Sequence, residues 1–364
     1  MTIQTSLGRR NFLVSAAAVT GGFSLGFHVP FLDDGVANAQ AVKELNAWVV
    51  VHPDDKVVIR VARSEMGQGT LTGLCQLVAE ELDCDWNKVT WEYPTPGENL
   101  ARNRVWKNFS TGGSRGIRES NQYVREGGAM AREMLIAAAA AQWKVPASEC
   151  SVSAGVITHK DQKLTYGAVA AAAAQLEPPK EVKLKDPKDW KIAGKPLKRL
   201  DTVDKVTGKQ IYGMDYTMPG MLIAAVRACP VIGGKLKSFD AAKVEKMPGV
   251  KKVVAIDGNA VAVVADTYWH AQAALAALPT EWDVGKLGEV QQDGINAMLK
   301  EGLDANEAFV GNKAGDAKGA IAGAAKKIEA VYNFPYQHHV TMEPMNATAR
   351  YTADKCEDWC GTQN

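Results

Sequence analysis

Two glycine-rich segments carry the residue types that could bind an anion. Their sequences are Met66-Gly67-Gln68-Gly69-Thr70 and Thr111-Gly112-Gly113-Ser114-Arg115-Gly116. Glycine lets the backbone approach a phosphate closely, and successive N–H groups before a helix can converge on negative charge. Gln68 adds an amide that both donates and accepts, as a pterin or nucleobase edge requires. Neither segment is a Walker A loop or a GxGxxG dinucleotide fingerprint, so a plain strand-to-helix turn is the alternative for each.

Each glycine-rich segment is expected to connect to a helix that follows it. The β-branched runs at 47–51 and 56–62 predict a hairpin, and apolar residues at helical spacing predict a helix over 70–82. A strand near 89–93 and a long helix over 117–143 are predicted next. Because Gly127 and Gly128 are costly inside that helix, they predict close packing against another backbone.

The second half of the chain changes character twice. Residues 177–200 hold four prolines and seven lysines, which is typical of a linker or of an extended strap. From residue 201 the pattern predicts an α+β unit. Its expected elements are a buried strand at 220–227, a short helix at 239–243, strands at 250–256 and 260–265, a helix at 269–278 and a closing segment at 281–283.

The cysteines and histidines predict no metal centre. None of the six cysteines lies in a CxxC or CxxCH pattern, so no iron–sulfur cluster or covalent haem is expected in this chain. If Cys356 to Cys360 is a strand, its ends lie about 13 Å apart, too far for a disulfide. Free thiols are therefore expected. His338 and His339 would point to opposite faces of a strand.

The first 39 residues have the order of an export signal. A twin-arginine segment at 6–13 precedes an uncharged stretch at 14–31, and Ala37-Asn38-Ala39 gives a small-residue cleavage pattern. This predicts a periplasmic protein exported by the twin-arginine route, with an uncleaved inner-membrane anchor as the alternative. Lys plus Arg is 42 and Asp plus Glu is 41 among 364 residues, of which 46% are hydrophobic. This balance disfavours a disordered chain and a nucleic-acid binder. A polytopic membrane protein is disfavoured because it needs several apolar runs of about 20 residues and only one segment comes close.

Four groups of residues resemble the large, molybdopterin-binding subunit of the xanthine oxidase/aldehyde oxidase family of molybdenum hydroxylases. The similarity is to the N-terminal half of that subunit, in the exported branch with isoquinoline 1-oxidoreductase beta subunits and aldehyde dehydrogenases. The matching segments are 65–70, 110–120, 199–222, and 341–344 together with 359–364.

The resemblance implies an α+β fold in which molybdopterin-binding α/β domain segments flank an α/β hammerhead domain. The expected divisions are a signal at 1–39, a partial molybdopterin-binding domain at 40–177, a linker at 178–200, the hammerhead domain at 201–285 and a truncated main molybdopterin-binding domain at 286–364. The implied cofactor is molybdopterin cytosine dinucleotide. The residues implied to hold it are Gly67, Gln68, Gly69, Thr70, Gly112, Gly113 and Ser114.

The resemblance also implies a reaction and partners. Gln363 matches a family glutamine that hydrogen-bonds an oxo ligand of molybdenum and is thus the candidate catalytic residue. The expected reaction hydroxylates an aldehyde or an N-heteroaromatic carbon with water as the oxygen source. A glutamate acts as the base in this reaction, and electrons pass to a small [2Fe-2S] subunit and then to a c-type cytochrome. The family's base glutamate and Gly-Gly-Phe-Gly loop would follow Gln363. We therefore expect this chain to be a fragment or one of two polypeptides, and inactive alone.

Two other functions remain open from the sequence. One is a non-catalytic exported cofactor-binding or scaffold protein derived from the same family. The other is an exported enzyme that binds a different phosphate-bearing cofactor, such as a flavin or a nicotinamide.

Overall fold

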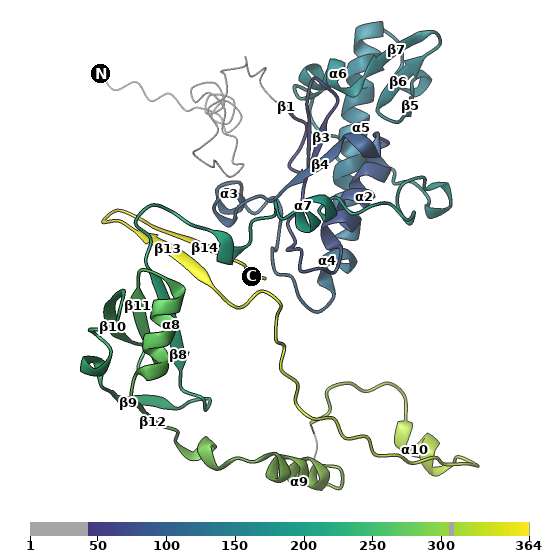
Figure 1. The fold of residues 1–364 in the computed structure, drawn as a ribbon. Coiled ribbons are helices and arrows are strands. Elements are labelled where there is room, and N and C mark those ends of the chain that lie inside the picture. Colours follow the sequence, from purple (N-terminus) through teal and green to yellow (C-terminus); the bar gives the residue numbers. More distant parts are fainter. Residues whose placement is uncertain (1–42, 306–308, 364) are drawn as a thin grey trace, which may run out of the picture. The chain divides into compact units, whose positions relative to one another are not determined.

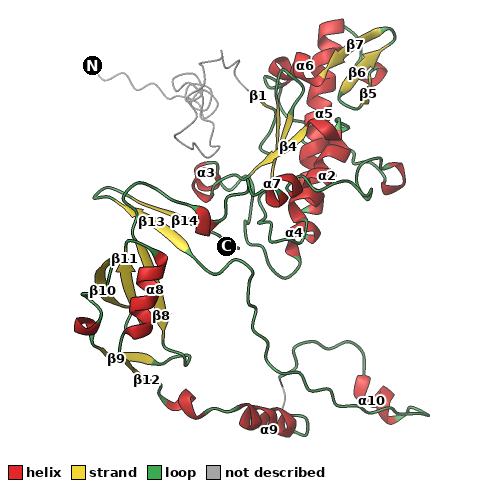
Figure 2. Ribbon diagram, in the orientation of Figure 1, coloured by secondary structure: helices red, strands yellow, loops and turns green. Residues whose placement is uncertain are grey.

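The computed structural model describes residues 43–305 and 309–363, so the predicted export signal lies outside the described residues. Two compact units divide the chain: residues up to 214 together with 345–364 form the first, and residues 215–344 form the second. Both mix helices with sheets, which confirms the α+β class (Figure 2). Within the described part, no helix is long and apolar enough to cross a membrane.

A four-stranded sheet and two long helices form the core of the first unit (Figure 1). The strand order is β1-β2-β3-β4, with β3 and β4 parallel and the other neighbours antiparallel. The bounds are β1 Lys43–Glu44, β2 Val49–Val51, β3 Val57–Arg60, β4 Val89–Glu92, α2 Thr70–Leu82 and α5 Asn121–Trp143. Helix α2 is the crossover between β3 and β4, and the first glycine-rich segment is the turn that begins it.

Helices α2 and α5 lie side by side (Figure 1). A Cβ atom added to Gly128 would lie 2.5 Å from the carbonyl oxygen of Val78 on α2, and one added to Gly127 would lie 2.7 Å from Trp48 Cδ1. The predicted close approach to another backbone is therefore confirmed for Gly128. Glycine is required there because a methyl group would push the two helices apart.

The single helix predicted over 117–143 is wrong at its start. The structure has a short helix α4, Arg115–Arg118, and α5 begins only at Asn121. The break falls at Ser120, whose hydroxyl accepts from Arg63 Nε at 3.1 Å and lies 2.5 Å from the Tyr123 hydroxyl. The break therefore coincides with a residue that bonds the buried Arg63, a partner that local periodicity does not register.

The remaining elements of the first unit are shorter. They are α3 Pro96–Ala101, the antiparallel sheet of β5 Ser151–Ser153, β6 Val156–His159 and β7 Gln162–Thr165, then α6 Tyr166–Ala173, α7 Thr202–Val206, and the hairpin of β13 Ala347–Tyr351 and β14 Cys356–Cys360. Cys356 and Cys360 sit at opposite ends of β14, and all six cysteines are free thiols. The prediction of free thiols is confirmed, since a strand keeps these two sulfur atoms apart.

The segment predicted as a linker or a strap is fixed to the first unit at residues 185–193, here called the strap. The Glu80 carboxylate on α2 accepts hydrogen bonds from three successive strap N–H groups at 2.6–3.1 Å. The Glu81 carboxylate accepts from the Lys185 N–H at 3.0 Å. The strap therefore runs against the C-terminal end of α2.

Helix α8 covers a sheet in the second unit. Strands β10, β11 and β8 form an antiparallel sheet, and β9 pairs with β12. The bounds are β8 Ile223–Ala228, β9 Lys235–Phe239, β10 Val250–Ile256, β11 Ala260–Ala265, α8 Tyr268–Ala277, β12 Thr280–Asp283, α9 Gln292–Gly302 and α10 Ala317–Ala322. The predicted elements at 250–256, 260–265 and 269–278 are confirmed.

Two expectations for this unit are wrong. The strand predicted as buried, β8, has one buried residue, Ala225, while Val226 is 57% exposed. Its two faces differ because α8 covers only one of them. The helix predicted at 239–243 is a 3₁₀ turn at 241–243 that follows strand β9. Pairing of β9 with β12 overrides the local pattern there, a tertiary effect that sequence periodicity does not carry.

Candidate cofactor-binding site

Three segments that the sequence analysis singled out meet in the first unit. The Ser64 N–H donates to Thr111 Oγ1 at 3.0 Å, and Ser64 Oγ donates to the Thr362 carbonyl oxygen at 2.9 Å. Thr111 and Gln363 pair through two bonds of 2.7 Å, one from the Thr111 N–H to the Gln363 carbonyl and one from Gln363 Nε2 to the Thr111 carbonyl. The fold thus brings both glycine-rich loops and the candidate catalytic glutamine together.

The first loop is shaped by two left-handed glycines and by a carboxylate. Gly67 and Gly69 have φ of 97° and 83°, and Gly69 precedes the first residue of α2. The Glu65 carboxylate accepts from the N–H groups of Gly67 at 2.7 Å, Gly69 at 3.0 Å and Leu71 at 3.1 Å. Donors that the sequence assigned to a phosphate are therefore already bonded to a side chain of the protein.

Gln68 and Thr70 also serve the loop itself. Gln68 Oε1 accepts from the Met66 N–H at 2.5 Å, and Gln68 Nε2 donates to the Ser64 carbonyl at 2.9 Å. Thr70 is buried at the start of α2, next to Gly116, where an added Cβ would lie 3.0 Å from Thr70 Cγ2. Gln68 is exposed, whereas Thr70 is buried and lies against Gly116 of the second loop.

The second loop keeps donors that have no partner. Within the described part of the chain, the N–H groups of Gly112, Gly113 and Ser114 have no acceptor. Gly113 and Ser114 are exposed and both left-handed, with φ of 55° and 57°. Three consecutive free N–H groups on an exposed turn fit an oxyanion such as a phosphate.

The arginines beside the second loop bind its carbonyl groups. Arg115 Nε donates to the Gly112 carbonyl at 3.1 Å, and Arg118 Nη2 donates to the Gly113 carbonyl at 3.3 Å. These bonds use the carbonyl oxygens of Gly112 and Gly113 and leave the N–H groups of the turn without a partner among the described residues. The positive charge of both guanidinium groups stays close to the same turn.

Sequence reasoning missed the buried Arg63. Its side chain is 3% exposed, and its guanidinium donates to Ser120 Oγ and to the Ser110 carbonyl. Arg63 follows strand β3, so these bonds connect the end of that strand to Ser110, just before the second loop. An arginine directly after the predicted strand at 56–62 was the available signal, because an arginine that follows a buried strand and is itself buried needs partners.

Arg199 was missed as well, although its segment carried part of the resemblance. Its guanidinium lies 3.1 Å from Glu65 Oε1 and donates to Asp201 and to the Gly67 carbonyl. The hydrogen bond with Asp201 raises the pKa of Arg199, and the same bond, with Lys205 contributing, lowers the pKa of Asp201. Both groups are therefore charged at neutral pH beside the first loop.

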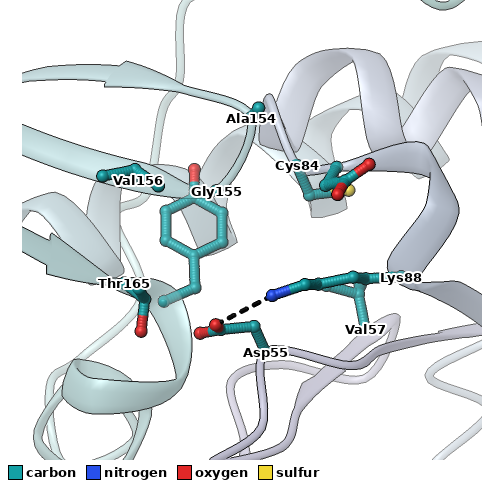
Figure 3. Close-up of a pocket in the computed structure, with 10 residues that line it drawn as sticks. Asp55, Val57, Cys84, Lys88, Ala154, Gly155, Val156 and Thr165 are labelled. Carbon is teal, nitrogen blue, oxygen red and sulfur yellow. Dashed lines mark hydrogen bonds and ion pairs between the residues drawn. The ribbon is translucent and has the colours of Figure 1, made fainter.

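A separate hollow of about 50 Å³ lies between β6 and the turn that precedes β4, lined by Asp55, Lys88 and Tyr166 among others (Figure 3). Lys88 Nζ points to Asp55 at 3.0 Å, and Asp55 Oδ1 accepts from the Gly167 N–H at 2.8 Å. Burial raises the pKa of the Cys84 thiol to about 12, so this sulfur is not a nucleophile at neutral pH. The polar groups of this hollow satisfy one another, which indicates a structural role.

The described residues contain no group of three or more His, Cys, Asp or Glu side chains placed to hold a metal ion. A sequence profile described as the molybdopterin cofactor-binding domain matches residues 14–231, which is well over half of the chain.

The chain belongs to the molybdopterin cofactor-binding family. It is the molybdenum-binding type of subunit found in the xanthine oxidase family, as the resemblance predicted. Three curated relatives agree with this assignment. The beta subunit of isoquinoline 1-oxidoreductase from Brevundimonas diminuta is 29% identical over 98% of this chain. A membrane-bound aldehyde dehydrogenase from Gluconacetobacter polyoxogenes is 27% identical over 95%, and a nicotinate dehydrogenase subunit from Pseudomonas putida is 28% identical over 91%.

The chain aligns with only part of each of these relatives. The aligned region covers 52%, 46% and 28% of their respective lengths. The chain thus spans about half the length of the first two. The profile match does include both glycine-rich loops and the Arg199 segment.

Proposed function

We propose that this chain supplies the N-terminal cofactor loops of a molybdenum hydroxylase that oxidises an aldehyde or an N-heteroaromatic carbon. One observation carries the proposal: the two glycine-rich loops and Gln363 converge, and the second loop presents three N–H groups without an acceptor among the described residues. The family match supports a molybdopterin, and we propose the cytosine dinucleotide form.

The second loop is the proposed phosphate-binding part of the site. Gly112, Gly113 and Ser114 would donate their N–H groups to a phosphate oxygen, and the nearby guanidinium groups of Arg115 and Arg118 would offset its charge. The exposed Gly67 and Gln68 would line the opposite side, and Gly69 and the buried Thr70 would support them. In the first loop, Gln68 is the exposed side chain that could turn its amide toward a pterin edge.

Gln363 is proposed to orient the reactive end of the cofactor. Its Nε2 already donates to the Thr111 carbonyl, and an amide nitrogen carries a second hydrogen that can reach an oxygen ligand. When bound, the molybdopterin would supply the two-electron oxidation and the activated oxygen that the protein's own side chains cannot provide.

The remaining expectations are part of the same proposal. The strands and helix of 223–283 are assigned to an α/β hammerhead domain. The partners are a small [2Fe-2S] subunit and a c-type cytochrome, and the signal at 1–39 directs the protein to the periplasm by the twin-arginine route. Relatives named for aldehyde, isoquinoline and nicotinate oxidation support this substrate class.

The test is to isolate the protein from its native host under non-denaturing conditions and to measure its cofactor directly. We expect molybdenum and an oxidised-pterin fluorescence signal close to one per chain, and release of cytidine monophosphate on acid hydrolysis. Gly113→Val should lose this cofactor. Gly258→Val is the matched control, since Gly258 is also left-handed and open but belongs to the second unit.

Three results would count against the proposal. Absence of both molybdenum and pterin in the wild type would favour the non-catalytic scaffold. A flavin absorption spectrum would favour a different phosphate-bearing cofactor. Equal cofactor content in Gly113→Val and Gly258→Val would remove the second loop from the site.

A further inference from the structure

We propose that Arg199 is a positioning residue for the first cofactor loop, acting through Glu65. The group formed by Glu65, Arg199 and Asp201 is called the Arg199 clamp. The effect of the clamp on cofactor retention rests on the proposed function, whereas its effect on the conformation of the loop does not.

The Arg199 clamp reaches the loop at two points. Arg199 Nη2 lies 3.1 Å from Glu65 Oε1, and Arg199 Nη1 donates to the Gly67 carbonyl at 2.9 Å. The remaining face of the guanidinium is held by Asp201 in a two-point pair of 3.0 and 2.9 Å. Because a planar guanidinium makes these bonds in fixed directions, the position of Asp201 determines where Glu65 and Gly67 lie.

The clamp itself is anchored to α2. The Leu200 N–H donates to Thr72 Oγ1 at 3.1 Å, and Lys205 Nζ pairs with Asp201 Oδ2 at 2.6 Å. The chain around Arg199 is therefore fixed to the first turn of the same helix that the loop begins. Loop and clamp share one rigid support, so bonds between them can fix the conformation of the loop.

The burial of the Glu65 and Asp201 carboxylates explains why the Arg199 cation is needed between them. The Glu65 and Asp201 side chains are only 7% and 3% exposed, while Arg199 is 35% exposed. Two desolvated carboxylates repel each other and would repel an incoming phosphate at short range. Arg199 lies between them and offsets this charge. It thus keeps Glu65 bonded to the N–H groups of the loop and limits the negative potential at the site.

The experiment compares Arg199→Met with Arg199→Lys in the full chain, with Lys198→Met as the matched control. Lys198 is the adjacent, exposed cation. Amide hydrogen exchange is measured on cofactor-free protein, and bound pterin is measured on protein from the native host. In Arg199→Met, the amides of Gly67, Gly69 and Leu71 should exchange about tenfold faster, because charge-assisted bonds of the loop are lost. Bound pterin should fall by a similar factor.

The conservative variant separates charge from geometry. Arg199→Lys keeps the positive charge but cannot make the two-point pair, so it should recover part of the pterin content and little of the exchange protection. Lys198→Met should match the wild type in both measurements.

Several outcomes would overturn the inference. Unchanged exchange at the three loop amides in Arg199→Met would do so, as would equal acceleration across α5, which would indicate general loss of structure. Normal pterin content together with fast loop exchange would show that the clamp orders the loop without serving the cofactor. If the wild type holds no pterin, the proposed function fails, while the exchange data still decide whether Arg199 positions the loop.

Discussion

At each end of helix α2, a carboxylate accepts hydrogen bonds from three backbone N–H groups, but the two ends differ in their surroundings. At its N-terminal end, the Glu65 carboxylate accepts from three N–H groups of the first loop. At its C-terminal end, the Glu80 carboxylate accepts from three successive N–H groups of the strap, Lys191 to Ala193. Each carboxylate is a protein anion held by backbone donors, with a cation beside it.

Burial separates the two ends. Glu80 and Glu81 are 1% and 0% exposed, and their partners close the core beneath the strap. Met66, Gly67 and Gln68 are exposed, so the loop that Glu65 shapes keeps one face open to solvent. Carboxylate-to-backbone bonding alone therefore does not identify a ligand site. Openness of the same turn, and free donors nearby, are what distinguish it.

The largest expected effect is at the buried end. Glu81→Ala removes the acceptor of Arg125 Nε at 2.9 Å and of the Lys185 N–H, and leaves Arg125 and Arg132 without their carboxylate. Removing one partner from a buried ion pair typically costs about 3–5 kcal/mol. The free energy of unfolding, measured with urea, should fall by that amount.

The control for this change is Lys188→Ala on the same strap. Lys188 pairs with Asp186 at the surface, and its side chain is 75% exposed, so the loss should stay within about 1 kcal/mol. Equal losses for the two variants would mean that the strap is not held by buried charge.

Gly128→Ala tests the packing between α2 and α5. The new methyl group would meet the Val78 carbonyl at 2.5 Å, where backbone on both helices has to move. Overpacking of this kind costs about 1–3 kcal/mol. Gly97→Ala is the control, because nothing lies within 4 Å of a Cβ added there. Unfolding midpoints should separate the two variants, and a neutral Gly128→Ala would contradict the close approach.

Gly67→Ala tests the open end. Nothing lies within 4 Å of a Cβ added at Gly67, but its φ of 97° disfavours any side chain. We expect a loss of about 1–2 kcal/mol from backbone strain alone. The bound pterin per folded chain should fall as well, by more than this small loss of folding stability could cause. If stability falls as far as in Gly128→Ala while pterin is retained, the contrast between the two ends fails.

The smallest expected effect is the pH dependence of the stability that Glu80 contributes. Burial raises the pKa of Glu80, but the N–H groups of Ile192 and Ala193 and the Lys185 ammonium lower it more, so the net pKa lies below its ordinary value of 4.5. A lowered pKa contributes stability that is fully present above the ordinary value and is lost as pH falls through the folded-state pKa. The stability gap between wild type and Glu80→Gln should therefore be constant above about pH 6 and narrow below about pH 4.5. A gap that widens in acid would reverse the assigned sign.

The sequence predicted elements correctly where short-range residue spacing alone determines the local structure. Helix α2 spans the predicted residues 70–82, and the cysteines at 356 and 360 are at opposite ends of a strand. It failed at Ser120, at strand β9 and at the outer face of β8. In each of these places a distant partner decides the outcome: Arg63, strand β12 and the one-sided cover by α8.

The candidate site divides in the same way. Glycine content and spacing were enough to find both loops, since only glycine adopts the left-handed turns that Gly67 and Gly69 need without cost. The sequence could not show that Glu65 already occupies the donors of the first loop. It also could not show that Arg199, more than 130 positions later, pairs with that carboxylate.

The sequence by itself therefore determined the family, the positions of the two loops and helix α2 after the first loop, because these depend on short-range pattern. Only the tertiary structure decided which N–H groups are free. Hydrogen-bond acceptors such as Glu65, Glu80 and the Gln363 carbonyl reach donors far away in the chain. A donor satisfied by such an acceptor is less available to a ligand, and among the described residues the N–H groups of Gly112, Gly113 and Ser114 stay without an acceptor, which is why we propose this turn as the anion site.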